Sequence, residues 1–166
     1  MNEFYLSLGG NIGDTMSFFK KALLELDALT KEKIIVSPVY RSKSWGFEAQ
    51  QDFLNCCVKV SSVIEPLSFL LELKKIEQNA GRTQKSTENG YASRVLDIDI
   101  IYCDSLKIME EGLVIPHPER LNRNFVLYPL ADIASSFVDP IVCKTVKELK
   151  DLCKDEVEVV KVGEFV

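Results

Sequence analysis

Residues 95–103 read VLDIDIIYC, the most strand-like stretch of the chain. Successive side chains of a strand point to opposite faces, so the apolar residues are expected to face a core while Asp97 and Asp99 stand side by side on the other face. The core-facing residues are Leu96, Ile98 and Ile100. Aspartate is among the poorest strand formers, so two of them at this spacing call for a chemical explanation.

The segments before this strand alternate between the two types of regular structure. The predicted elements are, in order, a strand at 4–9, a helix at 15–30, strands at 33–42 and 53–60, and a helix between Pro66 and Gly81. Apolar residues recur at helical spacing in the first helix, and proline and glycine suit the start and the end of the second. With the strand at 95–103, the order β-α-β-β-α-β is typical of the ferredoxin-like, split βαβ arrangement.

The rest of the chain extends this core. A short strand near 106–108, helices near 125–134 and 145–154, and a last strand near 157–162 are expected. We therefore predict a single α+β domain over residues 1–166, with a ferredoxin-like βαββαβ core, extra strands and helices, a mainly antiparallel sheet and three α/β/α layers.

Composition excludes several classes of protein. The 166 residues carry a net charge of −5, whereas a nucleic-acid binder needs a basic surface. The chain contains no apolar run of about 18 residues, the length that a membrane-spanning helix needs. The N-terminus also lacks a signal-peptide pattern, so a cytoplasmic location is expected. The five cysteines contain no Cys-x-x-Cys pair and His117 is the single histidine, which excludes His-rich metal sites.

The two aspartates favour a hard metal ion. Carboxylates this close repel each other, and an oxygen-seeking cation would remove the repulsion. Mg²⁺ typically takes one or two carboxylates together with substrate phosphates. The alternative is a solvated polar face of a half-buried sheet, and the Asp pair alone does not distinguish the two interpretations.

Basic residues gather just before the Asp pair. Between Lys74 and Arg94 the chain has five basic and two acidic residues, a local charge of +3 in an acidic protein. Arg82 and Arg94 flank a polar stretch without periodicity, and loops of that length inside compact domains are usually functional. Guanidinium groups bind phosphate oxygens in a forked geometry, so these arginines are expected to contact phosphate. Lys75 and Lys85 are expected to be solvated surface charges.

The usual phosphate-binding loops are missing. The stretch 81–86 lacks the second glycine of a P-loop, and the glycine-rich run at 9–14 does not match the dinucleotide fingerprint. We interpret this run as a tight strand-to-helix turn.

A second candidate site lies on the strand at 53–60. Phe53 and Asn55 share one face, opposite the core-facing side chains of the strand. A flat heterocycle could stack on Phe53 while Asn55 reads its hydrogen-bonding edge. The alternative is that Phe53 fills a second small core under the loop at 42–51.

Six short motifs occur along the chain in one order. They are Tyr5-Leu-Ser-Leu-Gly-Gly-Asn-Ile-Gly-Asp14, Asp52-Phe-Leu-Asn55, Glu77 to Arg82 ending in Gly-Arg, Arg94-Val-Leu-Asp-Ile-Asp99, Ile115-Pro-His-Pro118 and Asn122-Arg-Asn-Phe125. On these motifs, residues 4–135 resemble the 6-hydroxymethyl-7,8-dihydropterin pyrophosphokinase family of folate synthesis. The combination of Arg-x-x-Asp-x-Asp with the later Pro-His and Arg-x-Phe is highly specific.

The resemblance implies a reaction and its substrates. Pyrophosphate would move from ATP to the hydroxymethyl group of 6-hydroxymethyl-7,8-dihydropterin, with release of AMP. By position, Asp97 and Asp99 would bridge two Mg²⁺ ions on the triphosphate. Arg82 and Arg94 would be the catalytic residues that hold the phosphates and offset the charge of the transition state.

The resemblance also implies the substrate contacts. The further ATP-binding residues would be Lys74, Glu77, Ile100, His117 and Arg123. The pterin-binding residues would be Ser42, Trp45, Phe53, Asn55, Asp97 and Phe125, with Phe53 and Phe125 on the two sides of the ring. The loops at 43–51 and 82–94 would close over the substrates and exclude water. Lys74 and Trp45 depart from the usual family residues, and the run 91–94 departs from the family's aromatic-Gly-Pro-Arg.

Two other functions stay open. Another Mg-ATP enzyme, such as an ordinary kinase or a nucleotidyl transferase, would be distinguished by the nucleotide it releases. A noncatalytic ligand-binding module on a ferredoxin-like fold would not need an Asp pair beside two arginines. Neither nucleic acid nor a membrane is expected as a partner, and the chain is expected to be a monomer or a weak dimer.

Overall fold

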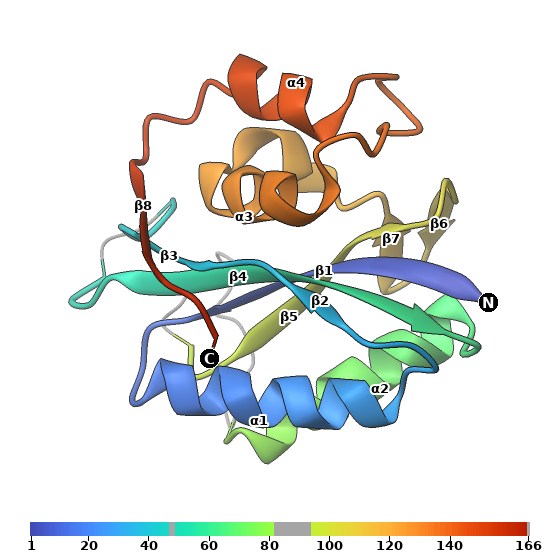
Figure 1. Cartoon of the computed structure of the whole chain (residues 1–166), viewed down its shortest axis with the longest axis horizontal. Helices are drawn as coiled ribbons and strands as arrows, with labels where there is room; N and C mark the ends of the chain where they lie inside the picture. Colours follow the sequence, from blue (N-terminus) through green and yellow to red (C-terminus); the bar gives the residue numbers. More distant parts are fainter. Residues whose placement is uncertain (47–48, 82–93, 166) are drawn as a thin grey trace.

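The computed structural model describes residues 1–46, 49–81 and 94–165 (Figure 1). The first elements are β1 (Asn2–Gly10), α1 (Thr15–Ala28), β2 (Ile35–Val36), β3 (Val39–Ser42), β4 (Phe53–Ser62), α2 (Pro66–Asn79) and β5 (Asp97–Cys103). They are followed by β6 (Ile108–Glu110), β7 (Leu113–Ile115), the 3₁₀ helix η1 (Pro118–Asn122), α3 (Asn124–Ala134), α4 (Val146–Leu152) and β8 (Val159–Gly163).

The main sheet has six strands in the order β5-β1-β4-β3-β8, with β2 paired to β4. Every pairing in it is antiparallel. β1 lies between β4 and β5, because α1 carries the chain past β1 to the β3–β4 hairpin and α2 returns it to the other side of β1. This is the ferredoxin-like order, so the predicted α+β fold with a mainly antiparallel sheet is confirmed.

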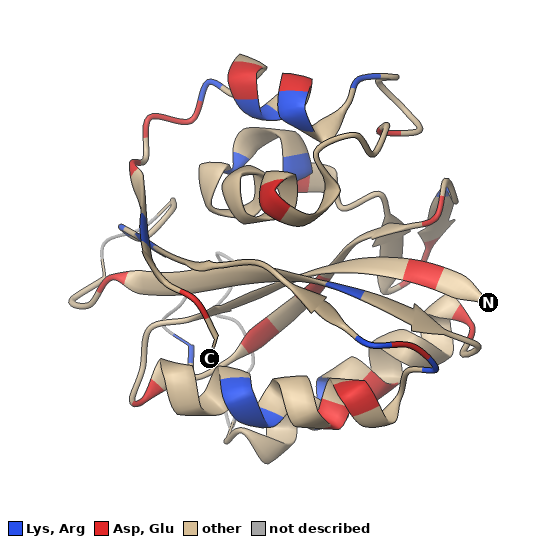
Figure 2. Ribbon diagram, viewed as in Figure 1, with Lys and Arg blue, Asp and Glu red and all other residues tan. Residues whose placement is uncertain are grey.

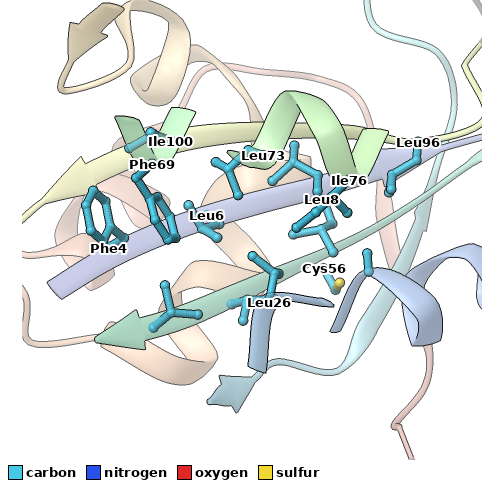
Figure 3. Close-up of a cluster of buried hydrophobic side chains, with 14 of the residues drawn as sticks. Phe4, Leu6, Leu8, Leu26, Cys56, Phe69, Leu73, Ile76, Leu96 and Ile100 are labelled. Carbon is cyan, nitrogen blue, oxygen red and sulfur yellow. The ribbon is translucent and has the colours of Figure 1, made fainter. Parts of the chain in front are cut away.

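Helices cover both faces of the sheet, which gives the predicted three layers (Figure 1). The face toward α1 and α2 carries the larger core, where alternating side chains of β1 and β4 meet the two helices (Figure 3). Phe4 of β1 stacks on Phe69 of α2 with ring centroids 4.1 Å apart. A second core faces α3 and α4 and contains Tyr5, Cys57, Ile101, Tyr102, Val126, Leu130 and Val146.

A β-bulge lets β5 contribute to both cores. Leu6 pairs with Ile100 and Tyr5 pairs with Tyr102, so Ile101 is the extra residue between the two pairs. Plain alternation would have turned Tyr102 toward α1 and α2. With the bulge, Tyr102 shares the face of the Asp pair and is buried in the second core.

The predicted strand at 33–42 is two short strands in the structure. Both strands pair with β4. Pro38 lies between them and has no N–H to donate, so the pairing with β4 is interrupted there. The preceding side chain fills the gap, because Ser37 Oγ accepts a hydrogen bond from the backbone N–H of Cys57 at 2.9 Å.

The region after β5 also differs from the prediction. The strand expected near 106–108 is β6, which forms a hairpin with β7, and neither β7 nor η1 was predicted. The hairpin turns at Gly112, whose φ of +82° suits glycine. The helices at 125–134 and 145–154 and the last strand are confirmed as α3, α4 and β8.

Lysines alternate with acidic residues along α4 (Figure 2). None of the helices in the described part of the chain is both long and apolar enough to cross a membrane.

Candidate active site

Strands β1, β3, β4 and β5 all begin or end at one end of the sheet, where the predicted site residues gather. The terminal residues are Gly10 of β1, Ser42 of β3, Phe53 of β4 and Asp97 of β5. Across the sheet Asp97 pairs with Gly9, and Gly9 pairs on its other side with Asn55. Neighbouring strands are about 4.8 Å apart, so Asp97 and Asn55 lie on one face about 10 Å from each other. The predicted metal-binding and heterocycle-binding residues therefore share one surface.

Asp97 and Asp99 project from the same face of β5, as the sequence predicted. Their side chains keep 19% and 34% of their surface exposed. Arg94 forms an ion pair with Asp97. Burial and the negative charge of Asp97 raise the pKa of Asp99, although nearby basic side chains oppose the rise. A cation shared by the two carboxylates would relieve this repulsion.

The donor set fits Mg²⁺ bound together with phosphate. In residues 1–46, 49–81 and 94–165, no three His, Cys, Asp or Glu side chains form a protein-only metal site. Mg²⁺ usually takes one or two carboxylates and completes its octahedron with waters and substrate phosphates. The partly exposed pair on β5 supplies carboxylates of this kind.

His117 lies beside the Asp pair. Its Nε2 is 3.8 Å from Asp99 Oδ2, and its Nδ1 accepts a hydrogen bond from the backbone N–H of Glu119 at 3.1 Å. Burial lowers the pKa of His117. The negative charge of Asp99 acts to raise this pKa, and the positive charge of Arg123 acts to lower it further. With Nδ1 as an acceptor, the neutral imidazole carries its proton on Nε2. His117 can therefore donate a hydrogen bond at this site without carrying a charge.

A buried ion pair anchors the segment that carries His117. Arg120 of η1 donates from Nη2 to Asp139 Oδ1 and from Nη1 to the carbonyl of His117, both at 3.1 Å. Asp139 is fully buried and also accepts hydrogen bonds from Tyr102 and from two backbone N–H groups. Burial alone would raise the pKa of Asp139, but these hydrogen bonds lower it to about 2. No local motif indicates this pair, because its members are 19 residues apart.

Glu77, predicted as an ATP contact, is buried behind β5. Its side chain is 1% exposed, and Oε1 accepts a hydrogen bond from the backbone N–H of Ile98 at 2.8 Å. β5 is an edge strand of the sheet, so Glu77 satisfies an N–H that points away from β1. Lys74 Nζ lies 3.3 Å from Oε2 of the same carboxylate.

Ile100, also predicted as an ATP contact, has its side chain in the larger core (Figure 3). Ile98 and Ile100 are two residues apart, so the backbone N–H and C=O of Ile100 also point away from β1. A nucleotide could meet Ile100 only through these backbone groups.

Ser42 and Asn55 are brought together, as expected for one binding surface. Asn55 Nδ2 donates a hydrogen bond to Ser42 Oγ at 3.1 Å, and both side chains are buried. A Cβ on Gly9 would lie 3.0 Å from Asn55 Oδ1, so glycine at this position leaves room for the amide. Phe53 is half-buried at the start of β4.

Trp45, Arg123 and Phe125 form a cluster at the same end of the sheet. The guanidinium carbon of Arg123 lies 4.9 Å from the centre of the Trp45 ring and 5.6 Å from that of Phe125. The resemblance assigned the two aromatic residues to the pterin and Arg123 to ATP. The structure places all three side chains in contact.

The glycine-rich turn after β1 positions Arg94, a role that the sequence did not reveal. The backbone N–H of Asn11 donates to the carbonyl of Arg94 at 2.9 Å, and Asn11 Oδ1 accepts from the backbone N–H of Arg94 at 2.8 Å. A Cβ on Gly10 would lie 2.4 Å from the carbonyl oxygen of Val95. The paired glycines were the only local signal of this close approach.

Arg82, predicted as a catalytic residue, lies outside the described residues. The same is true of most of the predicted closing loop at 82–94 and of residues 47–48 in the other loop.

A model of the family 7,8-dihydro-6-hydroxymethylpterin-pyrophosphokinase (HPPK) matches residues 5–135. The chain is 39% identical over 151 residues to a 2-amino-4-hydroxy-6-hydroxymethyldihydropteridine pyrophosphokinase of Aquifex aeolicus, covering 90% of this chain and 91% of that protein. It is also 39% identical over 131 residues to the protein of the same name in Porphyromonas gingivalis, covering 78% of this chain and 89% of the relative. The folic acid synthesis protein FOL1 of Dictyostelium discoideum is 39% identical over 151 residues, but the match covers 90% of this chain and only 22% of that longer protein.

Solved structures have the same fold. The wild-type HPPK-DHPS of Plasmodium falciparum matches 90% of this chain with a TM-score of 0.68 at 16% identity. A further HPPK-DHPS crystal structure matches 90% of this chain with a TM-score of 0.69 at 17% identity. The present chain spans 44% and 43% of those two chains.

Proposed function

The chain belongs to the 7,8-dihydro-6-hydroxymethylpterin-pyrophosphokinase family and is a pyrophosphokinase of folate biosynthesis, and from this premise we propose its substrates and the roles of its site residues. The substrates would be ATP and 6-hydroxymethyl-7,8-dihydropterin. The hydroxymethyl oxygen forms a bond to the β-phosphorus of ATP and gives up its proton. The bond from the β-phosphorus to the oxygen bridging the α-phosphate breaks, and AMP leaves with that oxygen.

The row Asp97–Gly9–Asn55 across three neighbouring strands is the observation that carries the proposal. It places a pair of carboxylates suited to a metal–phosphate complex and a buried amide suited to a heterocycle on one face. The gap of about 10 Å between the two groups suits a bicyclic ring whose substituent extends toward the phosphates.

Asp97 and Asp99 would hold two Mg²⁺ ions together with the triphosphate. When bound, Mg²⁺ supplies charge neutralisation and alignment of the phosphates. Arg94, which pairs with Asp97, would turn its guanidinium to the phosphate oxygens once Asp97 serves as a metal ligand. Arg82 is proposed for the same task from the family resemblance.

The remaining ATP contacts follow from where the side chains lie. His117 would donate from Nε2 to a phosphate oxygen, and Lys74 would add positive charge at the rim. Ile100 would contact the nucleotide through its outward backbone groups. Glu77 would act by holding the edge of β5 through Ile98.

The pterin would bind over Asn55 and Ser42, with its amide edge read by Asn55. Phe53 and Phe125 are proposed as the stacking residues, and Trp45 would close one side of the pocket. Arg123 lies over both Trp45 and Phe125, so a ring that stacks on Phe125 would displace the guanidinium. The displaced group could then reach the phosphates, which accounts for its assignment to ATP.

Release of AMP tests the proposal. ATP and Mg²⁺ are incubated with the protein, with and without 6-hydroxymethyl-7,8-dihydropterin, and the nucleotide products are separated. Pterin-dependent AMP is the expected result. Formation of ADP would replace pyrophosphoryl transfer by an ordinary kinase reaction, and the absence of any nucleotide product would favour a ligand-binding module.

We further propose that residues 1–166 act as one domain, as a monomer or a weak dimer, in the cytoplasm. Light scattering over a range of protein concentrations tests the oligomeric state.

A further inference from the structure

The segment after α4 returns to the start of α3. Asp155 Oδ2 accepts a hydrogen bond from the backbone N–H of Asn124 at 2.8 Å. In return, Asn124 Nδ2 donates to the carbonyls of Asp155 at 2.8 Å and Val157 at 3.2 Å. Asp155 Oδ1 accepts from the backbone N–H of Val157 at 3.0 Å, which fixes the carboxylate itself. Asp155 and Val157 lie beyond residue 135, where the match to the family model ends, whereas Asn124 lies within it.

Asp155 supplies a cap that α3 does not supply for itself. The first N–H groups of a helix have no intrahelical partner, and a carboxylate there is favoured by both hydrogen bonding and the helix dipole. The N-cap residue of α3 is Arg123, whose side chain makes no capping hydrogen bond. The carboxylate of Asp155, 31 residues further along the chain, takes that position.

The first turn of α3 carries two of the proposed substrate contacts. Arg123 precedes Asn124 and Phe125 follows it, so the residue that Asp155 holds lies directly between them. Arg123 in turn lies over the rings of Trp45 and Phe125. Movement of the Asn124 backbone would therefore shift both side chains relative to Trp45.

The same segment forms one wall of a cavity beside this cluster. The cavity has a volume of about 620 Å³ and is lined by Lys43, Trp45, Asn122 and the segment 154–158. The segment thus faces Trp45 across open space, while its hydrogen bonds hold the turn that carries Arg123 and Phe125.

We infer that Asp155 is a positioning residue for the pterin subsite. By capping α3 it sets the places of Phe125 and Arg123 relative to Trp45. Trp45 and Phe125 are both proposed pterin contacts, whereas Arg123 is one of several proposed ATP contacts, so Asp155 governs pterin binding more than ATP binding. This inference rests on the proposed function, and it gives the segment 154–158 a part in the site although that segment lies outside the match to the family model.

The test compares Asp155→Ala with Asp151→Ala, a matched change at an exposed residue of α4. We expect Asp155→Ala to raise the KM for the pterin about tenfold, the range for loss of one helix cap, with the KM for ATP within about twofold of that of Asp151→Ala. Trp45 is the single tryptophan, so its emission reports the cluster directly. It should change in Asp155→Ala and stay unchanged in Asp151→Ala.

Asp155→Asn keeps one acceptor oxygen and is expected to lie between wild type and Asp155→Ala in both readouts. If Asp155→Ala does not fold, Asp155→Asn is tested in its place. We then expect a raised KM for the pterin and an unchanged KM for ATP. The inference would be overturned if Asp155→Ala lost pterin affinity and ATP affinity equally. It would also be overturned if the pterin affinity and Trp45 emission of Asp155→Ala equalled those of Asp151→Ala.

The wild-type protein separates the two levels of the proposal. If it forms no AMP, the proposed function fails, whereas the effect of Asp155 on Trp45 emission can still be measured. If it forms AMP and Asp155→Ala behaves like Asp151→Ala, only the positioning role fails.

Discussion

The side chain and backbone of Asn11 both bind the backbone of Arg94, through hydrogen bonds of 2.8 and 2.9 Å. Asn11 Nδ2 also lies 3.4 Å from the carbonyl oxygen of Gln51. One buried amide at the end of β1 therefore contacts the ends of both loops that the sequence predicted to close over the substrates.

Asn11→Ala is expected to lower kcat by between about ten- and a hundredfold. Arg94 would lose the partner that fixes its backbone, and small displacements of catalytic groups have effects of that size. Steady-state kinetics with both substrates measures it. Asn79→Ala, at the end of α2, is the matched control because Asn79 is exposed and bonds only Glu25 among the contacts described. Equal kinetics of the two variants would contradict the positioning of Arg94 by Asn11.

Arg94→Ala is expected to lower kcat by about two orders of magnitude or more, as for loss of one preorganised charge that stabilises a transition state. Arg41→Ala removes an exposed arginine of β3 and serves as the control. Unchanged turnover in Arg94→Ala would show that Arg94 does not stabilise the transition state and serves only as the ion-pair partner of Asp97.

Asp97→Ala is expected to abolish Mg²⁺-dependent turnover while the protein stays folded. The variant loses one metal ligand, but it also removes the charge that raises the pKa of Asp99. An exposed or partly exposed ion pair such as Arg94–Asp97 contributes only about 0–1 kcal/mol. Activity is measured over a Mg²⁺ titration, and circular dichroism checks the fold. Full activity with Mg²⁺ would rule out the two-metal site.

Gly9→Ala is expected to raise the KM for the pterin severalfold and to leave the KM for ATP nearly unchanged. The added Cβ would lie 3.0 Å from Asn55 Oδ1, so the amide must shift from its bond with Ser42. Gly163→Ala is the control, because no atom lies within 4 Å of a Cβ there. If both variants bind the pterin equally, Asn55 does not read the ring.

Asp139→Asn is expected to destabilise the protein by about 3–5 kcal/mol, the range for breaking a buried ion pair. The pKa of Asp139 is lowered from 3.8 to about 2, so the unfolded chain takes up this proton more readily than the folded one. The stabilisation is complete above about pH 4 and declines as the pH falls toward 2. Urea unfolding between pH 7 and 2 measures the free energy of unfolding of the wild type and of Asp139→Asn. The two values should approach each other as the pH falls toward 2. A difference that stays constant with pH would show that ionisation of Asp139 is not the source of the stabilisation.

Local patterns predicted the fold well because its core elements are strongly periodic. The bulge at Ile101 escaped prediction, since nothing in VLDIDIIYC distinguishes the extra residue from a regular one. The break at Pro38 was partly visible, because proline cannot donate to a ladder, but the inward turn of Ser37 depends on Cys57 in another strand.

The candidate site likewise has some features that local patterns predict and others that depend on residues far apart in the sequence. The shared face of Asp97 and Asp99, and that of Phe53 and Asn55, could be predicted from two-residue spacing, but the roles proposed for these residues come from the family resemblance. Asp155 and Asp139 could not be recognised, because each acts on a residue far along the chain and neither belongs to a local motif. The resemblance implies an ATP contact for Glu77, but no local pattern indicates that its carboxylate accepts a hydrogen bond from the backbone N–H of Ile98.

This use of Glu77 bears on how the protein behaves at high concentration. An edge strand offers free N–H groups on which a strand of another molecule can add, and such additions lead to aggregates. The buried carboxylate of Glu77 already occupies the N–H of Ile98, so an incoming strand could not pair with β5 at this residue. Glu77 thus closes one point on the edge of β5 to strand addition by another molecule.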